Sequence, residues 1–132
     1  MLTLFFILTL LVIGHFVADF CDFMYLGGIY RRILKAKLEY KGLYWLYVHG
    51  LVNGICYGLI AALFVTITSP IVLVVICIET ILHGGIDHLK SFYYHKNSIS
   101  YTDKGYWVAL GIDQMLHYFT IIGLTYLIYA FA

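Results

Sequence analysis

Histidine side chains recur four residues from a carboxylate or an amide throughout the apolar part of this sequence. Five such pairs are present: His15/Asp19, His49/Asn53, Glu79/His83, His83/Asp87 and Asp113/His117. Random placement of the 6 histidines among the Asp, Asn and Glu residues would give roughly 0.8 pairs, so the pattern is not an accident of composition. Because residues i and i+4 lie on one face of a helix, about 6 Å apart, each pair presents both side chains in one direction.

Imidazole and carboxylate groups in this number are typical of a metal site. The apolar segments contain no Lys or Arg to balance Asp19, Asp87 and Asp113, and a divalent cation would supply that positive charge. We predict a divalent metal, Zn, Fe or Mn, because mixed nitrogen and oxygen ligation does not select among them. The predicted metal ligands are His15, Asp19, His49, His83, Asp87, Asp113 and His117. They exceed the four ligands of a closed tetrahedral zinc site, so one or two ions are expected.

Three further polar residues lie near the predicted ligands. Glu79 is the candidate catalytic residue, because it lies one turn deeper than His83 and could act as a ligand, a general base or a proton relay. Asn53 and Gln114 are expected to hold the ligands in place through hydrogen bonds. An alternative interpretation needs no metal, since Asp–His contacts can also join helices inside a membrane.

These side chains must be positioned by membrane-spanning helices. The chain of 132 residues is 63% hydrophobic and 11% charged, whereas a soluble domain keeps roughly 25% charged residues. Crossing the hydrocarbon as a helix takes about 20 mostly apolar residues, and four segments qualify: 2–22, 43–67, 70–89 and 106–131. Pro70 suits the first turn of a helix, which makes the middle two spans a tight hairpin. We predict an all-α fold, a four-transmembrane-helix antiparallel bundle that forms a single integral membrane domain over 1–132.

The basic residues predict the orientation of this bundle. They lie in the connections after the first and third spans: Arg31, Arg32, Lys35, Lys37, Lys41, Lys90, Lys96 and Lys104. In a four-span chain these connections share one side, which the positive-inside rule places in the cytoplasm, with both termini outside. Residues 24–41 mix basic and apolar side chains and predict a short interfacial helix between spans one and two. Aromatic residues beside both connections suit a membrane interface: Tyr44, Trp45, Tyr47, Tyr93, Tyr94, Tyr101, Tyr106 and Trp107.

The polar pairs return to one depth although the chain alternates in direction. His15 and His83 lie a similar distance before the ends of their spans. His49 and Asp113 lie a similar distance after the starts of theirs. At 1.5 Å per residue, all four lie about 10 Å below the cytoplasmic edge. The sequence therefore predicts one shared polar site, and Gly84 and Gly85 beside His83 favour close approach of a neighbouring helix.

The segments "GHFVADF", "HGGIDHLK" and "DQMLH", together with His49, carry a resemblance to a known family. They resemble the domain-of-unknown-function family of small bacterial and phage inner-membrane proteins, which has G-H-F-x-A-D-F, H-x-x-x-D-x-x-K and D-Q-x-x-H motifs. The resemblance covers nearly the whole chain and brings forward His15, Asp19, His49, His83, Asp87, Lys90, Asp113, Gln114 and His117. It departs at Asp22, where the family often has Gln. The resemblance implies an integral membrane protein of the bacterial inner membrane and implies no activity.

The residues favour a membrane-embedded metal-dependent enzyme, a hydrolase acting on a lipid or lipid-linked substrate near the cytoplasmic leaflet. In such a site the metal would polarise a carbonyl or phosphoryl oxygen and lower the pKa of bound water. The alternatives are a metal-ion or proton transporter, and a non-catalytic membrane effector with a structural metal. The expected partners are membrane lipids and a lipid-like substrate, with no nucleic acid, and a homo-oligomer remains an open alternative.

Overall fold

All regular secondary structure in the described part of the chain is helical. The computed structural model describes residues 1–25 and 27–132, and the side chains of 20–27, 29 and 30, which include Cys21 and Asp22, lie outside the description. Five helices follow one another: α1 (Leu2–Tyr25), α2 (Gly27–Glu39), α3 (Tyr44–Ala61), α4 (Pro70–Lys96) and α5 (Lys104–Phe131). The described residues form no strand, so the predicted all-α fold is confirmed.

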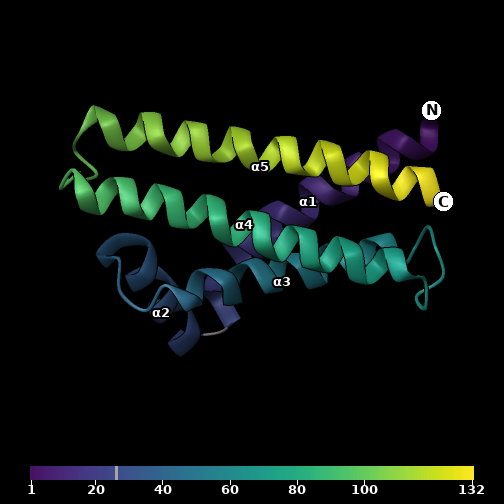
Figure 1. The fold of residues 1–132 in the computed structure, drawn as a ribbon, viewed down its shortest axis with the longest axis horizontal. Helices are drawn as coiled ribbons and strands as arrows, with labels where there is room; N and C mark the ends of the chain where they lie inside the picture. The colour runs from purple at the N-terminus through teal and green to yellow at the C-terminus, as the bar shows by residue number, and fades with distance from the viewer. Residues whose placement is uncertain (26) are drawn as a thin grey trace.

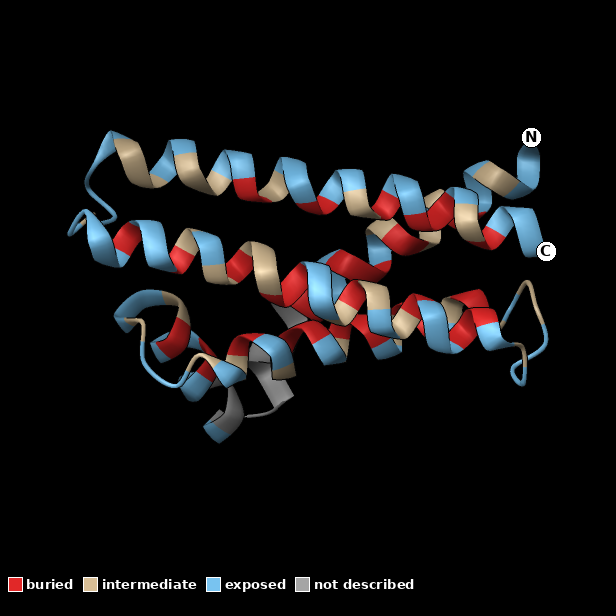
Figure 2. Cartoon of the chain, viewed as in Figure 1, coloured by how far each residue is buried: buried red, intermediate tan, exposed pale blue. Residues whose placement is uncertain are grey.

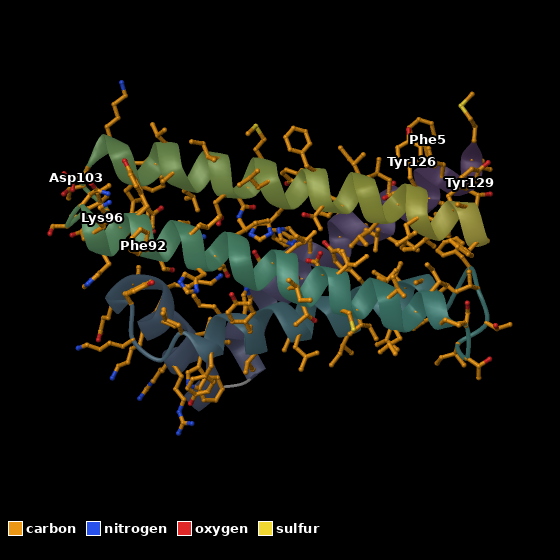
Figure 3. All side chains as sticks on the ribbon, in the orientation of Figure 1. Phe5, Phe92, Lys96, Asp103, Tyr126 and Tyr129 are labelled. Atoms are coloured by element: carbon orange, nitrogen blue, oxygen red, sulfur yellow. The ribbon has the colours of Figure 1, made fainter. Side chains whose placement is uncertain are left out.

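The long helices run side by side in alternating directions (Figure 1). Both termini lie at the end of the molecule where α3 connects to α4, and α2 lies toward the end where α4 connects to α5. Figure 3 labels Phe5, Tyr126 and Tyr129 at the first end, and Lys96 and Asp103 at the second. The two connections that carry the basic residues therefore lie toward the same end.

Three helices are long and apolar enough to cross a membrane. They are Leu2–Asp19 within α1, Pro70–Lys96 and Lys104–Phe131. The prediction of a span over 43–67 is wrong in its extent, because α3 ends at Ala61 and is not among the three. The chain closes the end of α3 with backbone hydrogen bonds from Leu63 to Ile60 and from Phe64 to Ala61, and then turns. Pro70 stands in the first turn of α4, as predicted.

Glycines of α3 explain how this short helix packs so closely on α4. A Cβ atom added to Gly50 would lie 2.6 Å from the backbone oxygen of Thr80. One added to Gly54 would lie 2.7 Å from the backbone oxygen of Ile76. Small residues four apart allow two backbones to approach in this way, and packing takes the place of a hydrophobic driving force inside a membrane. This close approach of the two helices holds the α3 side chains between Gly50 and Gly54, including Asn53, against α4.

The buried residues divide the molecule into an apolar half and a polar half. Toward the termini, the core is made of aliphatic side chains and Tyr57 from α1, α3, α4 and α5: Ile7, Leu11, Tyr57, Val75, Leu124 and Ile128 are among them. Toward α2, the buried residues are mainly histidines and carboxylates. The outward sides of the long helices are exposed, as Figure 2 shows. The polar groups thus meet inside the bundle, away from its outer surface.

The amphipathic helix α2 covers the polar half from one side. Ile33 and Ala36 are buried, whereas Arg31, Arg32 and Lys35 are exposed. This division of faces is what an interfacial helix needs. The helix spans Gly27–Glu39, within the predicted 24–41, and the chain then turns through Tyr40 and Gly42 at positive φ into α3.

Candidate metal centre

His83 is the centre of a group of four imidazole rings. The ring centroid of His83 lies 4.2 Å from that of His117 and 4.9 Å from that of His49. The ring centroid of His15 lies 5.5 Å from that of His83 and 5.1 Å from that of His117. The four rings come from α1, α3, α4 and α5. The predicted convergence of one histidine from each long helix is therefore observed.

Asp19 joins three of these histidines. Its Oδ1 atom lies 3.0 Å from Nε2 of His49 and 3.3 Å from Nε2 of His83, and its Oδ2 atom lies 3.6 Å from Nε2 of His15. Asn53 donates a hydrogen bond of 3.2 Å from Nδ2 to the Oδ1 atom of Asp19. The carboxylate and the amide are both buried. Asn53 thus orients the carboxylate toward the imidazoles, as expected of a group that holds a ligand in place.

Glu79 contacts the opposite side of the His83 ring. The Nδ1 atom of His83 lies 3.1 Å from Oε1 of Glu79, one turn earlier on α4. A carboxylate that accepts a hydrogen bond from Nδ1 fixes the ring so that Nε2 is the free basic nitrogen. In His83 that nitrogen faces Asp19 and His49. Glu79 therefore orients the His83 ring. The sequence itself suggests Glu79 only as a ligand, a general base or a proton relay.

Two lysines contradict the expectation that Asp87 and Asp113 lack a positive partner. Lys90 Nζ lies 3.0 Å from Oδ1 of Asp87 and 2.8 Å from Oδ2 of Asp113. Lys37 Nζ, from α2, lies 2.7 Å from Oδ2 of Asp87. Helix α4 continues to Lys96, beyond the predicted end of the span at residue 89, which turns Lys90 inward on the same face as Asp87. Of the three carboxylates in that argument, only Asp19 has no lysine paired with it in the described residues.

All seven predicted ligands and Glu79 belong to one connected cluster with three groups suited to an ion. In each group, one ligand atom per residue lies within 4.8 Å of the others. The groups are Asp19–His49–His83, His15–Glu79–His83 and Asp87–Asp113–His117. In the third group, both carboxylates already form ion pairs with lysines, so the first two groups are the stronger candidates for a metal site. They share His83, whose two ring nitrogens face different carboxylates.

Several buried polar atoms of the cluster have no hydrogen-bond partner within the described part of the chain. They include both ring nitrogens of His15, Oε2 of Glu79, and the facing pair of Asp113 Oδ1 and His117 Nε2, which lie 3.7 Å apart. Buried polar groups in folded proteins are almost always paired, so unpaired ones point to a missing partner. A metal ion or water beside the imidazoles would satisfy them.

Sequence reasoning missed Lys37 as a member of the site. Its basic type and its place on an amphipathic helix suggested a solvated residue, and only the docking of α2 on α4 brings it to Asp87. Gly84 has the predicted packing role, because an added Cβ would meet the Tyr47 ring at 2.6 Å, whereas the prediction is wrong for Gly85, where an added Cβ meets no described atom within 4 Å. Gln114 lies beside Asp113, donating a 3.2 Å hydrogen bond from Nε2 to Oδ2.

Two histidines and two cysteines of the described residues lie apart from the cluster: His88, His95, Cys56 and Cys77. Tyr40 forms a 3.0 Å hydrogen bond with Nε2 of His88, and its ring stacks on that of His95. The Cys56 thiol donates to the backbone oxygen of Gly14 at 3.8 Å. Cys77 is exposed.

Together these features define a class of protein: a helical fold in which three of the described helices are long and apolar enough to cross a membrane, with a buried histidine–carboxylate centre. The chain belongs to the DUF3307 family, described as proteins of unknown function, whose model matches residues 7–131. No curated protein and no solved structure gives a significant match.

Proposed function

We propose that this protein is a membrane-embedded metal-dependent enzyme, a hydrolase that acts on a lipid or lipid-linked substrate. The observation that carries the proposal is the group of four buried imidazoles from four helices, with the carboxylates of Asp19 and Glu79 among them. A divalent ion, Zn, Fe or Mn, fits this ligand chemistry. The first ion would lie among Asp19, His49 and His83.

The proposed ion would use the three atoms that already face one another. Oδ1 of Asp19 lies within 3.3 Å of the Nε2 atoms of both His49 and His83. Three protein ligands with a fourth position left for water is the usual pattern of a catalytic zinc site. Bound water in such a site is acidified and can attack a carbonyl or phosphoryl centre. The rings of His15 and His117 also lie beside His83, where they could ligate the same ion or a second one.

The proposed topology has four spans, with α3 as the second. Three helices meet the length and composition expected of a span, and α3 packs closely along α4 through its glycines. Both connections that contain basic residues lie toward one end of the molecule, away from the termini (Figure 1). The positive-inside rule then supports a bacterial inner-membrane protein with cytoplasmic connections and both termini outside. The centre would lie at the level of the cytoplasmic leaflet.

Transport is the weaker functional candidate, because the terminal half of the bundle has an apolar interior. A conduction path needs polar groups along its length. Toward the termini, the described buried side chains are aliphatic apart from Tyr57 and Thr125. The Thr125 hydroxyl donates to the backbone oxygen of Ile121, within its own helix. This half of the bundle is therefore better suited to holding the helices of the metal centre in place than to conducting ions or protons.

Elemental analysis of the purified full chain in detergent tests the proposal. The wild type should contain one or two equivalents of a transition metal per chain. His83→Ala should lose most of it, because His83 belongs to two of the three groups. His95→Ala is the matched control, since His95 is an exposed histidine on the same helix. A folded wild type that takes up no Zn, Fe or Mn would refute the proposal, as would equal metal content in the two variants.

A further inference from the structure

A small chamber lies between α2 and α5. Helix α2 packs mainly on α3 and α4, and residues of α2 and α5 form opposite walls of the chamber. Its volume is about 160 Å³. A cavity of about 150 Å³ lined by apolar side chains can hold a benzene ring. The chamber is therefore large enough for an organic group of about six carbon atoms.

Asp19 connects this chamber with the candidate metal centre. The carboxylate lines the chamber, and its Oδ1 atom lies within 3.3 Å of the Nε2 atoms of both His49 and His83. Asp19 is only 8% exposed, whereas Leu34 and Leu38 in the α2 wall are 36% and 54% exposed. The walls thus reach from the buried centre to the surface of α2, and a group held in the chamber would lie beside the proposed ion.

The charged groups around the chamber balance one another. Lys37 pairs with Asp87, and Lys90 pairs with both Asp87 and Asp113, so two ammonium groups face two carboxylates. The proposed divalent ion balances the two remaining carboxylates of the centre, Asp19 among them. A charged group in the chamber would therefore find no free counter-charge in a buried site, which is costly. The chamber favours an uncharged occupant.

Most of the wall is apolar. Leu34, Leu38 and Leu110 contribute aliphatic surface. The rings of Tyr94 and Tyr106 stack with centroids 4.8 Å apart, and the Tyr94 hydroxyl donates to the backbone oxygen of Tyr106. These walls match a hydrocarbon segment of the occupant.

The polar part of the wall offers hydrogen-bond donors. The amide of Gln114 has two N–H donors, of which one binds Oδ2 of Asp113 at 3.2 Å. The ammonium groups of Lys37 and Lys90 each have three donors and do not use all of them on carboxylates. An ester group suits this wall, because it carries acceptor oxygens, no N–H or O–H donor and no charge.

We infer that the substrate is an uncharged carboxylic ester, whose carbonyl group lies beside Asp19 and whose first carbons, about six, lie in the chamber between α2 and α5. The inference deepens the proposed function and rests on it. In the hydrolysis, the oxygen of water joins the carbonyl carbon together with one of its hydrogens. The bond from that carbon to the alcohol oxygen breaks, and this oxygen takes the other hydrogen of water.

The test measures binding of acyl hydroxamic acids, by calorimetry, to the full chain in neutral detergent, loaded with the metal that it takes up. A hydroxamic acid binds a divalent ion through its two oxygens, so its acyl chain occupies the place proposed for that of the ester. Each buried methylene is worth roughly fourfold in affinity. Hexanohydroxamic acid should therefore bind at least about tenfold more tightly than acetohydroxamic acid. Adipic monohydroxamic acid, which has the same chain ending in a carboxylate, should lose this gain.

Leu110→Trp tests the chamber itself, because the larger ring would fill much of it. This variant should bind the two alkyl hydroxamic acids with nearly equal affinity, while its metal content and its affinity for acetohydroxamic acid stay unchanged. Leu38→Trp, from the opposite wall, should do the same and serves if Leu110→Trp does not fold. Leu116→Trp is the matched control, since Leu116 is on the same helix as Leu110 but lines the hollows between α4 and α5.

Three results would overturn the inference and leave the proposed function standing. The first is a metal-loaded wild type that gains nothing from the longer acyl chain. The second is equal chain-length dependence in Leu110→Trp and Leu116→Trp. The third is tighter binding of the carboxylate-ended chain, since the chamber would then select an anion. A folded chain that takes up no metal would overturn the proposed function and the inference with it, and metal content is measured before any hydroxamic acid is added.

Discussion

Replacing Gly50 by alanine should disturb both the stability of the bundle and its metal affinity. An added Cβ atom would lie 2.6 Å from the backbone oxygen of Thr80 and 3.0 Å from the backbone nitrogen of Gly84. Carbon and carbonyl oxygen ordinarily make contact at ~3.3 Å or more, so α3 must move by about 0.7 Å from α4. Backbone atoms cannot rotate away as the end of a side chain can. We expect the overpacking to cost about 1–3 kcal/mol.

The same displacement reaches the candidate site, because His49 precedes Gly50 and Gly84 follows His83. Separating α3 from α4 lengthens the contacts that His49 and His83 share with Asp19. Metal affinity should fall by roughly 10- to 100-fold, the range seen when groups that hold metal ligands are altered.

Two measurements on the purified protein check this prediction: reversible unfolding in mixed detergent, and metal titration. Gly111→Ala is the matched control, since an added Cβ meets no described atom within 4 Å. Glycine inside a helix costs about 0.5–1 kcal/mol relative to alanine, so Gly111→Ala should leave stability unchanged or raise it. If Gly50→Ala is as stable as Gly111→Ala and binds metal equally well, the reasoning from close approach is refuted.

Three further predictions concern charge, orientation and metal. Lys90→Met should destabilise the protein by about 3–5 kcal/mol, because it leaves the buried Asp113 carboxylate without its lysine and Asp87 with Lys37 alone. Adding Asp113→Asn should recover part of the loss in the same unfolding assay. In a cysteine-free background, Asn97→Cys should react with an impermeant maleimide from the cytoplasmic side only and Thr68→Cys from the other side only; labelling of both from one side of intact cells would exclude the four-span topology. Free metal at 100 times its Kd should stabilise the fold by about 2.7 kcal/mol, measured as a shift in the unfolding transition relative to chelator-treated protein.

The sequence predicts the centre better than it predicts the helices that hold it. Spacing of four residues fixes which side chains share a helix face, and equal depth in alternating spans brings His15, His49, His83 and His117 together. The end of α3 escaped prediction because the apolar run continues past Ala61, while the backbone turns in response to the hairpin that follows.

The lysine partners of Asp87 and Asp113 could not be predicted from the sequence for a different reason. The sequence predicts Lys90 to lie in a connection, because the apolar run stops just before it. Helix α4 instead continues to Lys96, and the Lys90 ammonium group points inward to Asp113. Lys37 is far from Asp87 in sequence and meets it only through the docking of α2. Hydropathy marks where lipid contact ends. It does not mark where a helix ends or which way a long side chain reaches.

The buried charges form two layers, and the deeper one leads to a last prediction. In the layer near α2, two lysines balance Asp87 and Asp113 without any metal. In the deeper layer, Asp19 and Glu79 lie among four imidazoles, and neutrality requires two positive charges. One divalent ion with neutral imidazoles provides them, and so do two protonated histidines in the metal-free protein.

Metal binding should therefore displace protons, because a ligating imidazole must be neutral. We expect up to two protons to be released per divalent ion near neutral pH. Calorimetric titration in buffers of different ionisation enthalpy measures this number directly. The His95→Ala variant should release the same number as the wild type, since His95 lies against Tyr40 and outside the cluster. Metal uptake without any proton release would mean that the metal-free site holds two uncompensated carboxylates inside the bundle, and the account of the deeper layer would fail.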